Sequence, residues 1–475
     1  MTAQDIDGLL TAFHNALRME GPLDVNVAAD RALYVAGLHG PRDAVGSLRR
    51  DILRTEGGGV FLFTGQAGSG ESTELQRLRR DLLAKNCKVY YCDLVEWLNF
   101  NEPVTLSSFL VALLSSWVDQ IGTLVAQRTP AERLISFFTG TRLIPEQLKL
   151  DAGVALKAQI QFALQSDENF RRDLEANLRK QLSSIVQQAH TLVAQLKLDL
   201  CPHGEKCVLL ADSMEKLAGY GDDARKVYDS VQRLFVSEGS ALKLPGLHVV
   251  YSVSPFLLEQ NNQLPSALGM GAVVTMPSVH VFQRNSTLPD AQGVAAVTDL
   301  VARRFARWSE VFTAAQLETI ILNTGGDLRE MLRAIRVAIN EDIESLPVAD
   351  AVVAFALNSV RPPKVIPAEH LAWMARLEAS HETELGGGID ALVLQRYLAT
   401  KHVLVYLNGE PWYAVHPLLR AWVTERAAKL AAEASAQAAT AAVTAAAATA
   451  LAPAPAPALA PALAPANPAA GQAGG

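Results

Sequence analysis

The chain has 475 residues, of which 49% are hydrophobic and 19% charged, the composition of a globular protein with room for two to four domains. A formal net charge of −7 gives no general electrostatic reason to bind nucleic acid. Four cysteines in so long a chain indicate a reducing compartment rather than a disulfide scaffold.

The N-terminus lacks the basic and apolar regions of a signal peptide. The longest apolar stretch, residues 104–125, is interrupted by serines, Asp119 and Gln120, which is typical of a buried helix and not of a membrane span. We therefore expect a cytoplasmic protein with no membrane partner.

A glycine-rich turn follows the first clear strand, residues 60–63, and precedes leucines at helical spacing from Leu75 onward. Gly65, Gly70 and Ser72 stand in register with the phosphate-binding pattern G-x-x-x-x-G-K-[ST]. In that pattern the glycines let backbone N–H groups surround a phosphate, the lysine neutralises the outer phosphates and the hydroxyl binds Mg²⁺.

Glu71 stands where this pattern has its lysine. A lysine about 4 Å from a phosphate contributes on the order of 4 kcal/mol at an effective dielectric constant of about 20, and a carboxylate reverses the sign. The next basic residue, Arg77, lies almost two helical turns further on. We expect Glu71 to impair nucleotide binding and hydrolysis. We also expect this anion at a helix N-terminus to close the empty loop on itself, stabilising it by about 0.3–1 kcal/mol relative to lysine.

The region after the loop helix is expected to hold a second strand at residues 88–93 and a long helix at residues 170–198, with shorter helices between them. Apolar and polar residues alternate over residues 148–164 around a turn. This alternation predicts a β-hairpin inserted beside the nucleotide-binding core.

The apolar strand 208–211 ends in Asp212, and Glu215 follows three residues later. An acid at such a strand end holds Mg²⁺ through water beside the loop hydroxyl, here Ser72, and a nearby glutamate polarises the attacking water. Asp212 fits the first role. For Glu215, a catalytic role and a helix-capping or surface role both stay open.

The strand at residues 247–254 ends in Ser252 and Ser254, which are either sensors of the γ-phosphate or ordinary strand-end serines. With a further strand at residues 272–276, five short apolar runs alternate with helices. This is the pattern of a parallel sheet with both faces covered.

From about residue 297 the sequence is helical, and Asp327 after two glycines predicts a helix start with Arg329 in its first turn. Prolines between residues 345 and 367 mark a boundary. The module expected beyond it is winged-helix-like, with helices at 368–379 and 390–400, strands at 403–406 and 412–415 around Asn408-Gly409, and a last helix from His416.

The fold class expected from these segments is α/β: a P-loop NTPase core with helices on both faces of a parallel sheet, a β-hairpin insertion, a helical lid, a winged-helix-like module and a disordered Ala/Pro tail. The expected segments are an N-terminal helical approach (1–55), the core (56–285), the lid (286–360), the module (361–427) and the tail (428–475).

Residues 65–75, Asp212 and residues 325–329 together resemble bacterial AAA-like and STAND-type P-loop ATPases of the ASCE class, over roughly residues 30–425. Members are nucleotide-driven switches, often in signalling or phage defence. The resemblance implies ATP and Mg²⁺ as cofactors, a protein partner or homo-oligomer, and Tyr34 or Arg42-Asp43 as cover for the adenine unless that segment only packs. The implied site residues are Glu215 and Arg329 for catalysis, Ser72 and Asp212 for the metal, and Gly65, Gly68, Ser69, Gly70, Glu71, Ser72, Thr73 and Ser252 for the nucleotide.

Other interpretations compete with an ATPase. The chain could be a non-catalytic scaffold that keeps the nucleotide-binding fold. Nucleic acid is an unlikely partner because Arg420, Arg426 and Lys429 are too few for a basic patch. Cys201, His203 and Cys207 could form a zinc clip, but no second ligand pair follows them.

Overall fold

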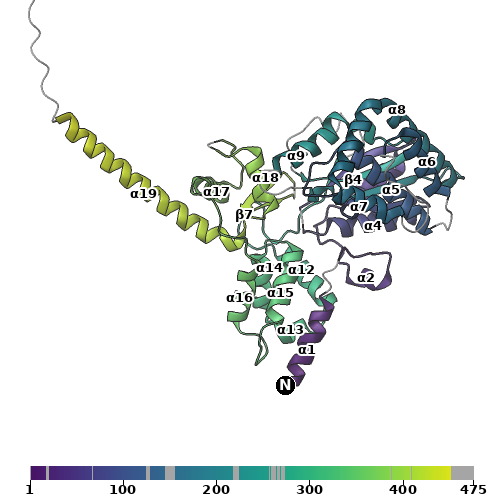
Figure 1. The fold of residues 1–475 in the computed structure, drawn as a ribbon. Helices are drawn as coiled ribbons and strands as arrows, with labels where there is room; N and C mark the ends of the chain where they lie inside the picture. The colour runs from purple at the N-terminus through teal and green to yellow at the C-terminus, as the bar shows by residue number, and fades with distance from the viewer. Residues whose placement is uncertain are drawn as a thin grey trace, which may run out of the picture.

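The computed structural model describes residues 2–17, 21–66, 68–124, 129–144, 156–217, 224–255, 257, 264, 268, 273–386, 388–407 and 409–450. Figure 1 shows an α/β body, a small C-terminal module beside it, a bundle of helices below that module, and the long helix α19 projecting from the module. Within the described residues, no helix has the length and apolar character needed to cross a membrane.

A five-stranded sheet forms the centre of the α/β body, with the order β2-β3-β4-β1-β5 and parallel pairing throughout. Its strands are β1 (Gly59–Thr64), β2 (Lys88–Asp93), β3 (Cys207–Asp212), β4 (Leu247–Ser252) and β5 (Val273–Thr275). The predicted parallel sheet is therefore confirmed, and all strand C-termini lie at one edge, where Asp93 pairs with Asp212.

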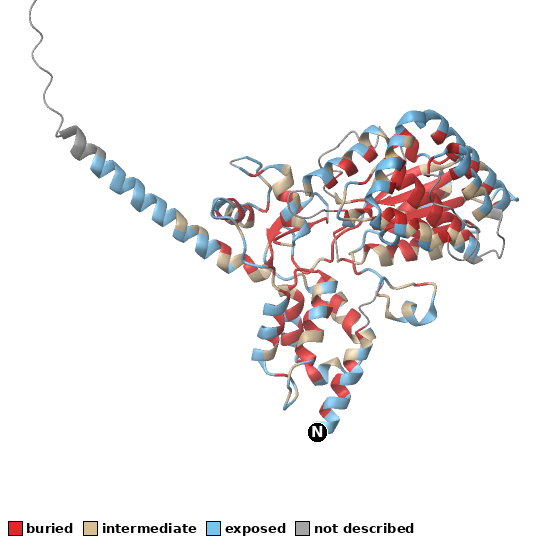
Figure 2. Ribbon diagram, viewed as in Figure 1, coloured by how far each residue is buried: buried red, intermediate tan, exposed pale blue. Residues whose placement is uncertain are grey.

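Successive residues of β1 face opposite sides of the sheet, as the pleat of a strand requires. Val60 and Leu62 belong to one apolar cluster, whereas Phe61 and Phe63 belong to another. Both faces of the sheet are buried in Figure 2. The helices on the Phe61 side are α3 (Ala44–Arg54) and α4 (Glu71–Leu83), and those on the other side are α5 (Leu106–Leu124), α6 (Thr129–Thr141), α7 (Leu156–Ser166) and α8 (Glu168–Leu200).

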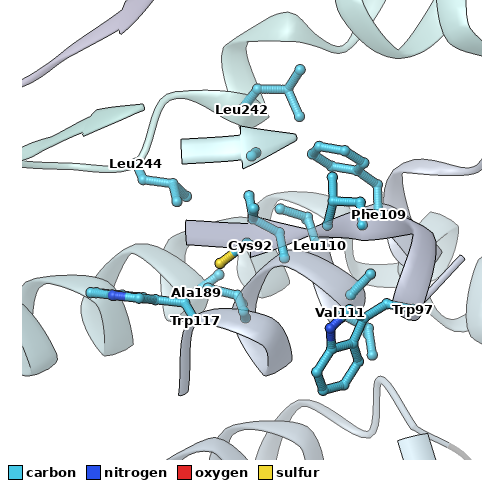
Figure 3. Close-up of a cluster of buried hydrophobic side chains, with 14 of the residues drawn as sticks. Cys92, Trp97, Phe109, Leu110, Val111, Trp117, Ala189, Leu242 and Leu244 are labelled. Atoms are coloured by element: carbon cyan, nitrogen blue, oxygen red, sulfur yellow. The ribbon is translucent and has the colours of Figure 1, made fainter. Parts of the chain in front are cut away.

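Helix α5 fills the second face with large side chains. Trp117 of α5 lies near Cys92 of β2 and Ala189 of α8 (Figure 3), and its ring meets that of Tyr90 edge to face at 6.1 Å. Burying an apolar side chain of this kind contributes about 1.5–3 kcal/mol or more. The predicted buried helix over residues 104–125 is thus confirmed by α5, which packs against α6, α7 and α8.

The predicted β-hairpin over residues 148–164 is wrong in its second half, and its first half lies outside the described residues. Residues from Leu156 form helix α7, with Leu156, Ile160, Ala163 and Leu164 buried and Phe162 exposed. The spacing i, i+4, i+7, i+8 is that of one helix face. Leu, Ala, Gln and Lys favour helix, and packing against α5 and α8 selects the helical face over the alternating one.

The helical bundle consists of α12 (Ala291–Arg304), α13 (Trp308–Val311), α14 (Ala314–Asn323), α15 (Leu328–Ile339) and α16 (Asp350–Val360). Helix α1 (Ala3–Ala16) packs on it (Figure 1). Phe13 of α1 stacks on Phe305 with ring centroids 4.5 Å apart, and Nε of Arg336 donates to Nε2 of His14 at 2.9 Å. The predicted N-terminal segment is therefore divided, with α1 on the bundle and α3 on the sheet.

The C-terminal module contains α17 (Ala368–Ser380), α18 (Ala391–Ala399), the antiparallel pair β6 (Val403–Tyr406) and β7 (Trp412–Val415), and the start of α19 (Pro417–Ala450). Both predicted strands are confirmed, while Asn408 of their turn lies outside the described residues. Tyr406 faces the bundle and donates its hydroxyl to the Gly325 carbonyl at 3.0 Å, whereas Val405 and Tyr413 face the module. The hairpin thus joins the bundle to the module.

The described part of the chain also contains shorter elements. They are α2 (Ala28–Leu33), α9 (Ala224–Gln232), the 3-10 turns Leu94–Glu96, Met214–Lys216 and Gly239–Leu242, and the π-helical turn Arg233–Ser237. All four cysteines are free and buried.

Candidate functional site

The phosphate-binding loop joins β1 to α4 at the C-terminal edge of the sheet. Gly68 and Gly70 have φ angles of 88° and 102°, a left-handed conformation that glycine adopts without strain. Both the amide and the hydroxyl of Ser69 donate to the Gln66 carbonyl, at 3.1 and 2.6 Å. The loop therefore curls back on itself before Glu71 begins the helix, as the sequence pattern predicts.

Two acids lie beside this loop. Asp212 at the end of β3 is fully buried, and its Oδ1 accepts from the Ser213 amide at 2.7 Å while its Oδ2 accepts from the Tyr91 hydroxyl. Glu215 follows in the short 3-10 turn, and its Oε2 accepts from the hydroxyl of Ser252 at the end of β4, at 2.7 Å. The structure thus brings Asp212, Glu215 and Ser252 to the same edge as the loop.

The electrostatics of Glu215 suit a general base. Burial raises the pKa of this carboxyl to about 7, with the negative charge of Asp212 as the second cause. The Ser252 hydrogen bond and the Lys216 ammonium act in the opposite direction. A carboxyl that titrates near neutral pH can take a proton from water in its ionised form.

Glu71 lies buried in the same site, only 6% exposed. The Glu71 oxygens accept no hydrogen bond from any described residue, although the nearby Gly65 amide acts to lower the pKa of this carboxyl. Burial, followed by the charges of Glu215 and Asp212, raises the pKa of Glu71 well above its usual range. Oε2 of this carboxyl lies 3.3 Å from the position of a Cβ on Gly65 of the loop. That the empty loop closes on the Glu71 carboxylate stays a prediction, as does the stabilisation expected from it. Burial destabilises the ionised form of Glu71.

The two hydroxyl residues after Glu71 differ. Ser72 is half-buried in the first turn of α4, the place of the metal-binding hydroxyl in the pattern. The Thr73 hydroxyl instead accepts from the Leu23 amide at 3.2 Å and so fastens the N-terminal segment to α4. Of this pair, Ser72 is better placed to be a ligand.

The start of α15 lies directly against the loop. Asp327 caps this helix, as predicted, by accepting from the Glu330 amide at 3.1 Å. A Cβ atom placed on Gly68 would lie 2.5 Å from Oδ1 of Asp327. Lys401 of the C-terminal module reaches the same place, with its Nζ 2.5 Å from Oδ2 of Asp327 and 3.3 Å from Oε1 of Glu330.

The predicted lid arginine is not at this contact. Arg329 is exposed, and it makes no hydrogen bond or ion pair within the described residues. Sequence reasoning missed Lys401, whose position gives no local signal because it follows α18 in a different module. It also missed Lys216, whose ammonium donates to the Ser213 hydroxyl at 2.8 Å. The position of Lys216 shortly after Asp212 in the sequence was the signal that could have indicated a place near the site.

A cavity of about 540 Å³ lies against Glu74, Arg77 and Arg80 of the loop helix. Tyr34, Arg42 and Asp43, which the sequence suggested as a cover for the base, all line it. The Tyr34 hydroxyl donates to Oε1 of Glu74 at 2.8 Å, and Arg77 pairs with both Glu74 and Asp43, at 2.8 and 2.6 Å. These charges are mutually paired, so the cavity has fixed polar walls.

The donor chemistry of the site fits Mg²⁺. Carboxylate and hydroxyl oxygens such as those of Asp212 and Ser72 are its preferred ligands, and the crowding that raises the pKa of Glu71 is what a cation would relieve. Among the described residues, no group of three or more His, Cys, Asp or Glu is arranged to bind a metal without help. The zinc clip at Cys201 and Cys207 therefore gains no support.

The strand order decides the fold. β1, which leads into the loop, is separated from β3, which carries Asp212, by one strand, β4. The chain has a P-loop NTPase fold of the ASCE class. The glycine loop, the acidic strand end and the parallel sheet with helices on both faces all belong to that fold.

Comparison with known proteins gives likenesses at low sequence identity. No family model matches the chain, and no curated protein matches it. The ORC2 protein of Aeropyrum pernix, solved with ADPNP and ADP, is 13% identical with a TM-score of 0.41, over 86% of this chain and 98% of that one. A Walker-type ATPase of Pyrococcus abyssi is 15% identical with a TM-score of 0.37, over 80% and 95%.

The ORC1 protein of Aeropyrum pernix, solved with DNA, is 12% identical with a TM-score of 0.36, over 83% of this chain and 94% of that one. Such likenesses carry no assignment of function, and the fold assignment stands on the strand order and loop described above. The comparisons also give no support to our expectation that nucleic acid is an unlikely partner.

Proposed function

We propose that the chain is an AAA-like or STAND-type P-loop ATPase that acts as an ATP-dependent switch, with nucleotide binding and hydrolysis weakened by Glu71. One observation carries the proposal: the glycine loop, Asp212 and the Ser252–Glu215 pair meet at the same edge of the sheet. In P-loop ATPases this edge is where phosphates bind.

The roles follow from the geometry. Loop amides and the N-terminus of α4 hold the phosphates. Asp212 and Ser72 would hold Mg²⁺, which supplies charge neutralisation at the β- and γ-phosphates when bound. Glu215 takes a proton from the attacking water, and Ser252 orients that carboxylate through its hydrogen bond. The cavity lined by Tyr34 and Arg77 receives the base.

Glu71 sets how strongly this site works. An ionised Glu71 would lose the lysine attraction of on the order of 4 kcal/mol and add a repulsion of similar size. Because burial raises its pKa, a neutral carboxyl removes the repulsion and leaves only the lost attraction. The affinity for nucleotide is then lower than that of a loop with lysine by roughly a thousandfold. Attraction and repulsion together would have lowered it by the square of that factor.

The contact between the loop and α15 provides the switch. Asp327 lies on Gly68, so a phosphate in the loop meets the first turn of the lid helix. The lid position would then depend on whether nucleotide is bound. By the resemblance, we propose a role in signalling or phage defence with a protein partner or a second copy of the chain.

The test is phosphate release and nucleotide affinity for the chain and for Glu71→Lys, with Glu71→Lys/Glu215→Gln as the matched control. We expect Glu71→Lys to bind Mg-ATP at least tenfold more tightly and to hydrolyse it, and the double variant to bind without hydrolysis. A folded Glu71→Lys variant that neither binds nor hydrolyses ATP contradicts the proposal.

A second candidate, a non-catalytic scaffold, is favoured by the burial of Glu71 itself. A buried acid beside two others opposes a bound phosphate, which is expected of a loop that does not need to hold one. The scaffold predicts that partners captured by the chain are the same with and without Mg-ATP. The switch predicts that the captured partners differ with and without Mg-ATP. Duplex DNA is one of the partners assayed, at two salt concentrations.

A further inference from the structure

The turn between α18 and β6 covers the phosphate-binding loop. A cavity of about 90 Å³ lies between them, lined on the loop side by Gly65, Gln66 and Glu215 and on the module side by Lys401 and Val405. The site that would hold the outer phosphates is therefore closed by the C-terminal module. Any group on this turn that points inward is a candidate for contact with the nucleotide.

Lys401 is such a group. Its backbone has φ 58°, which turns the chain sharply between α18 and β6. Its ammonium is held by Asp327 at 2.5 Å and Glu330 at 3.3 Å, and the Asp327 carboxylate lies against Gly68 of the loop. The ammonium is thus separated from the loop by one carboxylate.

The chemistry of lysine suits a transfer from that carboxylate to a phosphate. An ammonium has three donors on a flexible stem; within the described residues the Lys401 ammonium donates to Glu330 and forms an ion pair with Asp327. The side chain is 23% exposed, so its charge is partly removed from solvent screening. A small movement of the stem would reach the cavity without moving the module.

We propose that Lys401 binds the terminal phosphate of the nucleotide and supplies the positive charge that the loop lacks at Glu71. This inference rests on the proposed nucleotide-binding function and names a residue for it. The positive charge at the terminal phosphate then comes from the C-terminal module and not from a lysine of the loop.

Two other cations are less well placed. Lys216 donates to Ser213 and is exposed, and it does not line the cavity with Gly65 and Gln66. Arg329 is exposed on α15. Lys401 alone among the three lines that cavity.

Lys401 should affect the affinities for a nucleoside triphosphate and a diphosphate differently. A cation on the terminal phosphate contributes to ATP affinity and leaves ADP affinity nearly unchanged, because the loop amides hold the inner phosphates. Since Lys401 belongs to the C-terminal module, a triphosphate would hold that module over the loop and a diphosphate would not.

The experiment measures ATP and ADP affinities, with Mg²⁺, for the full chain and for Lys401→Gln, Lys401→Arg and the exposed control Lys429→Gln, and repeats Lys401→Gln in the Glu71→Lys background. We expect Lys401→Gln to weaken ATP on the order of 10- to 100-fold and ADP less than threefold. Lys401→Arg should restore most of the ATP affinity, and Lys429→Gln should change neither. In the Glu71→Lys background the effect should shrink, because the loop then has its own cation.

Each other outcome is decisive. Equal losses for ATP and ADP would mean that Lys401 only holds the module in place, and an ATP affinity unchanged within twofold would exclude the contact; either overturns the inference. Binding by Glu71→Lys with none by the unmodified chain overturns it too, since Lys401 then fails to replace the loop cation, but leaves the proposed function standing. No binding by any variant contradicts the proposed function itself.

Discussion

Asp327 and Gly68 touch although they belong to the lid helix and the phosphate-binding loop. A Cβ atom on Gly68 would lie 2.5 Å from Oδ1 and 2.6 Å from Oδ2 of that carboxylate. The glycine is therefore required twice, by its positive φ and by the approach of the lid. A change in the shape of the loop therefore changes its contact with the lid helix.

Gly68→Ala should be clearly more destabilising than Gly57→Ala. Both glycines have positive φ, which costs an alanine about 1–2 kcal/mol, but a Cβ on Gly57 meets nothing within 4 Å. The additional loss at Gly68 should be at least about 1 kcal/mol in urea unfolding. Equal losses would show that Asp327 moves aside freely and that the lid is not seated on the loop.

Glu71→Gln should stabilise the chain in metal-free buffer, and the gain should grow with pH. The folded pKa of Glu71 lies above its unfolded value of about 4.5, so the native chain loses stability as pH rises from that value through the folded pKa. The glutamine has no such loss. We expect almost no gain near pH 4 and a clear gain at pH 8, measured by chemical unfolding.

Glu433→Gln on the exposed part of α19 is the matched control and should give no gain at either pH. If Glu71→Gln destabilised the chain at pH 8, the ionised carboxylate would be a favourable loop anion after all.

His416→Gln should flatten the acid side of the stability profile. His416 is 2% exposed, and burial together with the charges of Lys401 and Arg420 lowers its pKa to about 3. Its neutral form therefore adds stability that is present above the unfolded pKa of about 6.5 and is lost as pH falls. Between pH 7 and 5 the native chain should lose about 2 kcal/mol more than the variant.

The exposed His203→Gln is the control for this titration. Parallel profiles for the native chain and His416→Gln would mean that His416 already carries a proton in the folded state.

Phe13→Ala should unfold the lid before the sheet. Phe13 is fully buried between Phe305 and Phe312, and removing such a ring costs about 3–5 kcal/mol. Phe162→Ala, with a residue 68% exposed, removes the same atoms at little cost. Hydrogen exchange should show faster opening of α12–α16 only in Phe13→Ala. Uniformly faster exchange in β1 and β4 would contradict a separate lid core.

The sheet and its loop could be predicted because their signals are local. Apolar runs at residues 60–63 and 208–211, glycines at fixed offsets and an acid at a strand end each follow from neighbouring residues. The cap at Asp327 and both hairpin strands at 403–406 and 412–415 were predicted for the same reason.

The helix α7 could not be separated from a strand by its pattern. Leu156, Ile160 and Leu164 are spaced four residues apart. This spacing is twice the strand period and close to one helical turn, so it fits both structures. Packing against α5 and α8 decides between them, and α5 lies far from α7 in the sequence.

The contacts that make the site specific are all non-local. Lys401 meets Asp327 across more than seventy residues, and α1 meets α15 across more than three hundred. The raised pKa of Glu71 also depends, after burial, on Glu215 and Asp212, which lie far along the chain. A negative charge at a helix start is favourable by itself, whereas burial and then the two neighbouring acids disfavour the ionised form of Glu71.

The most direct test of the account is isothermal titration of Mg-ATP into the unmodified chain and into Glu71→Lys at neutral pH. The account predicts weak but saturable binding to the unmodified chain, and binding at least tenfold tighter to Glu71→Lys. Absence of binding to both chains at millimolar Mg-ATP, with both shown to be folded, would contradict a nucleotide site at the C-terminal edge of this sheet.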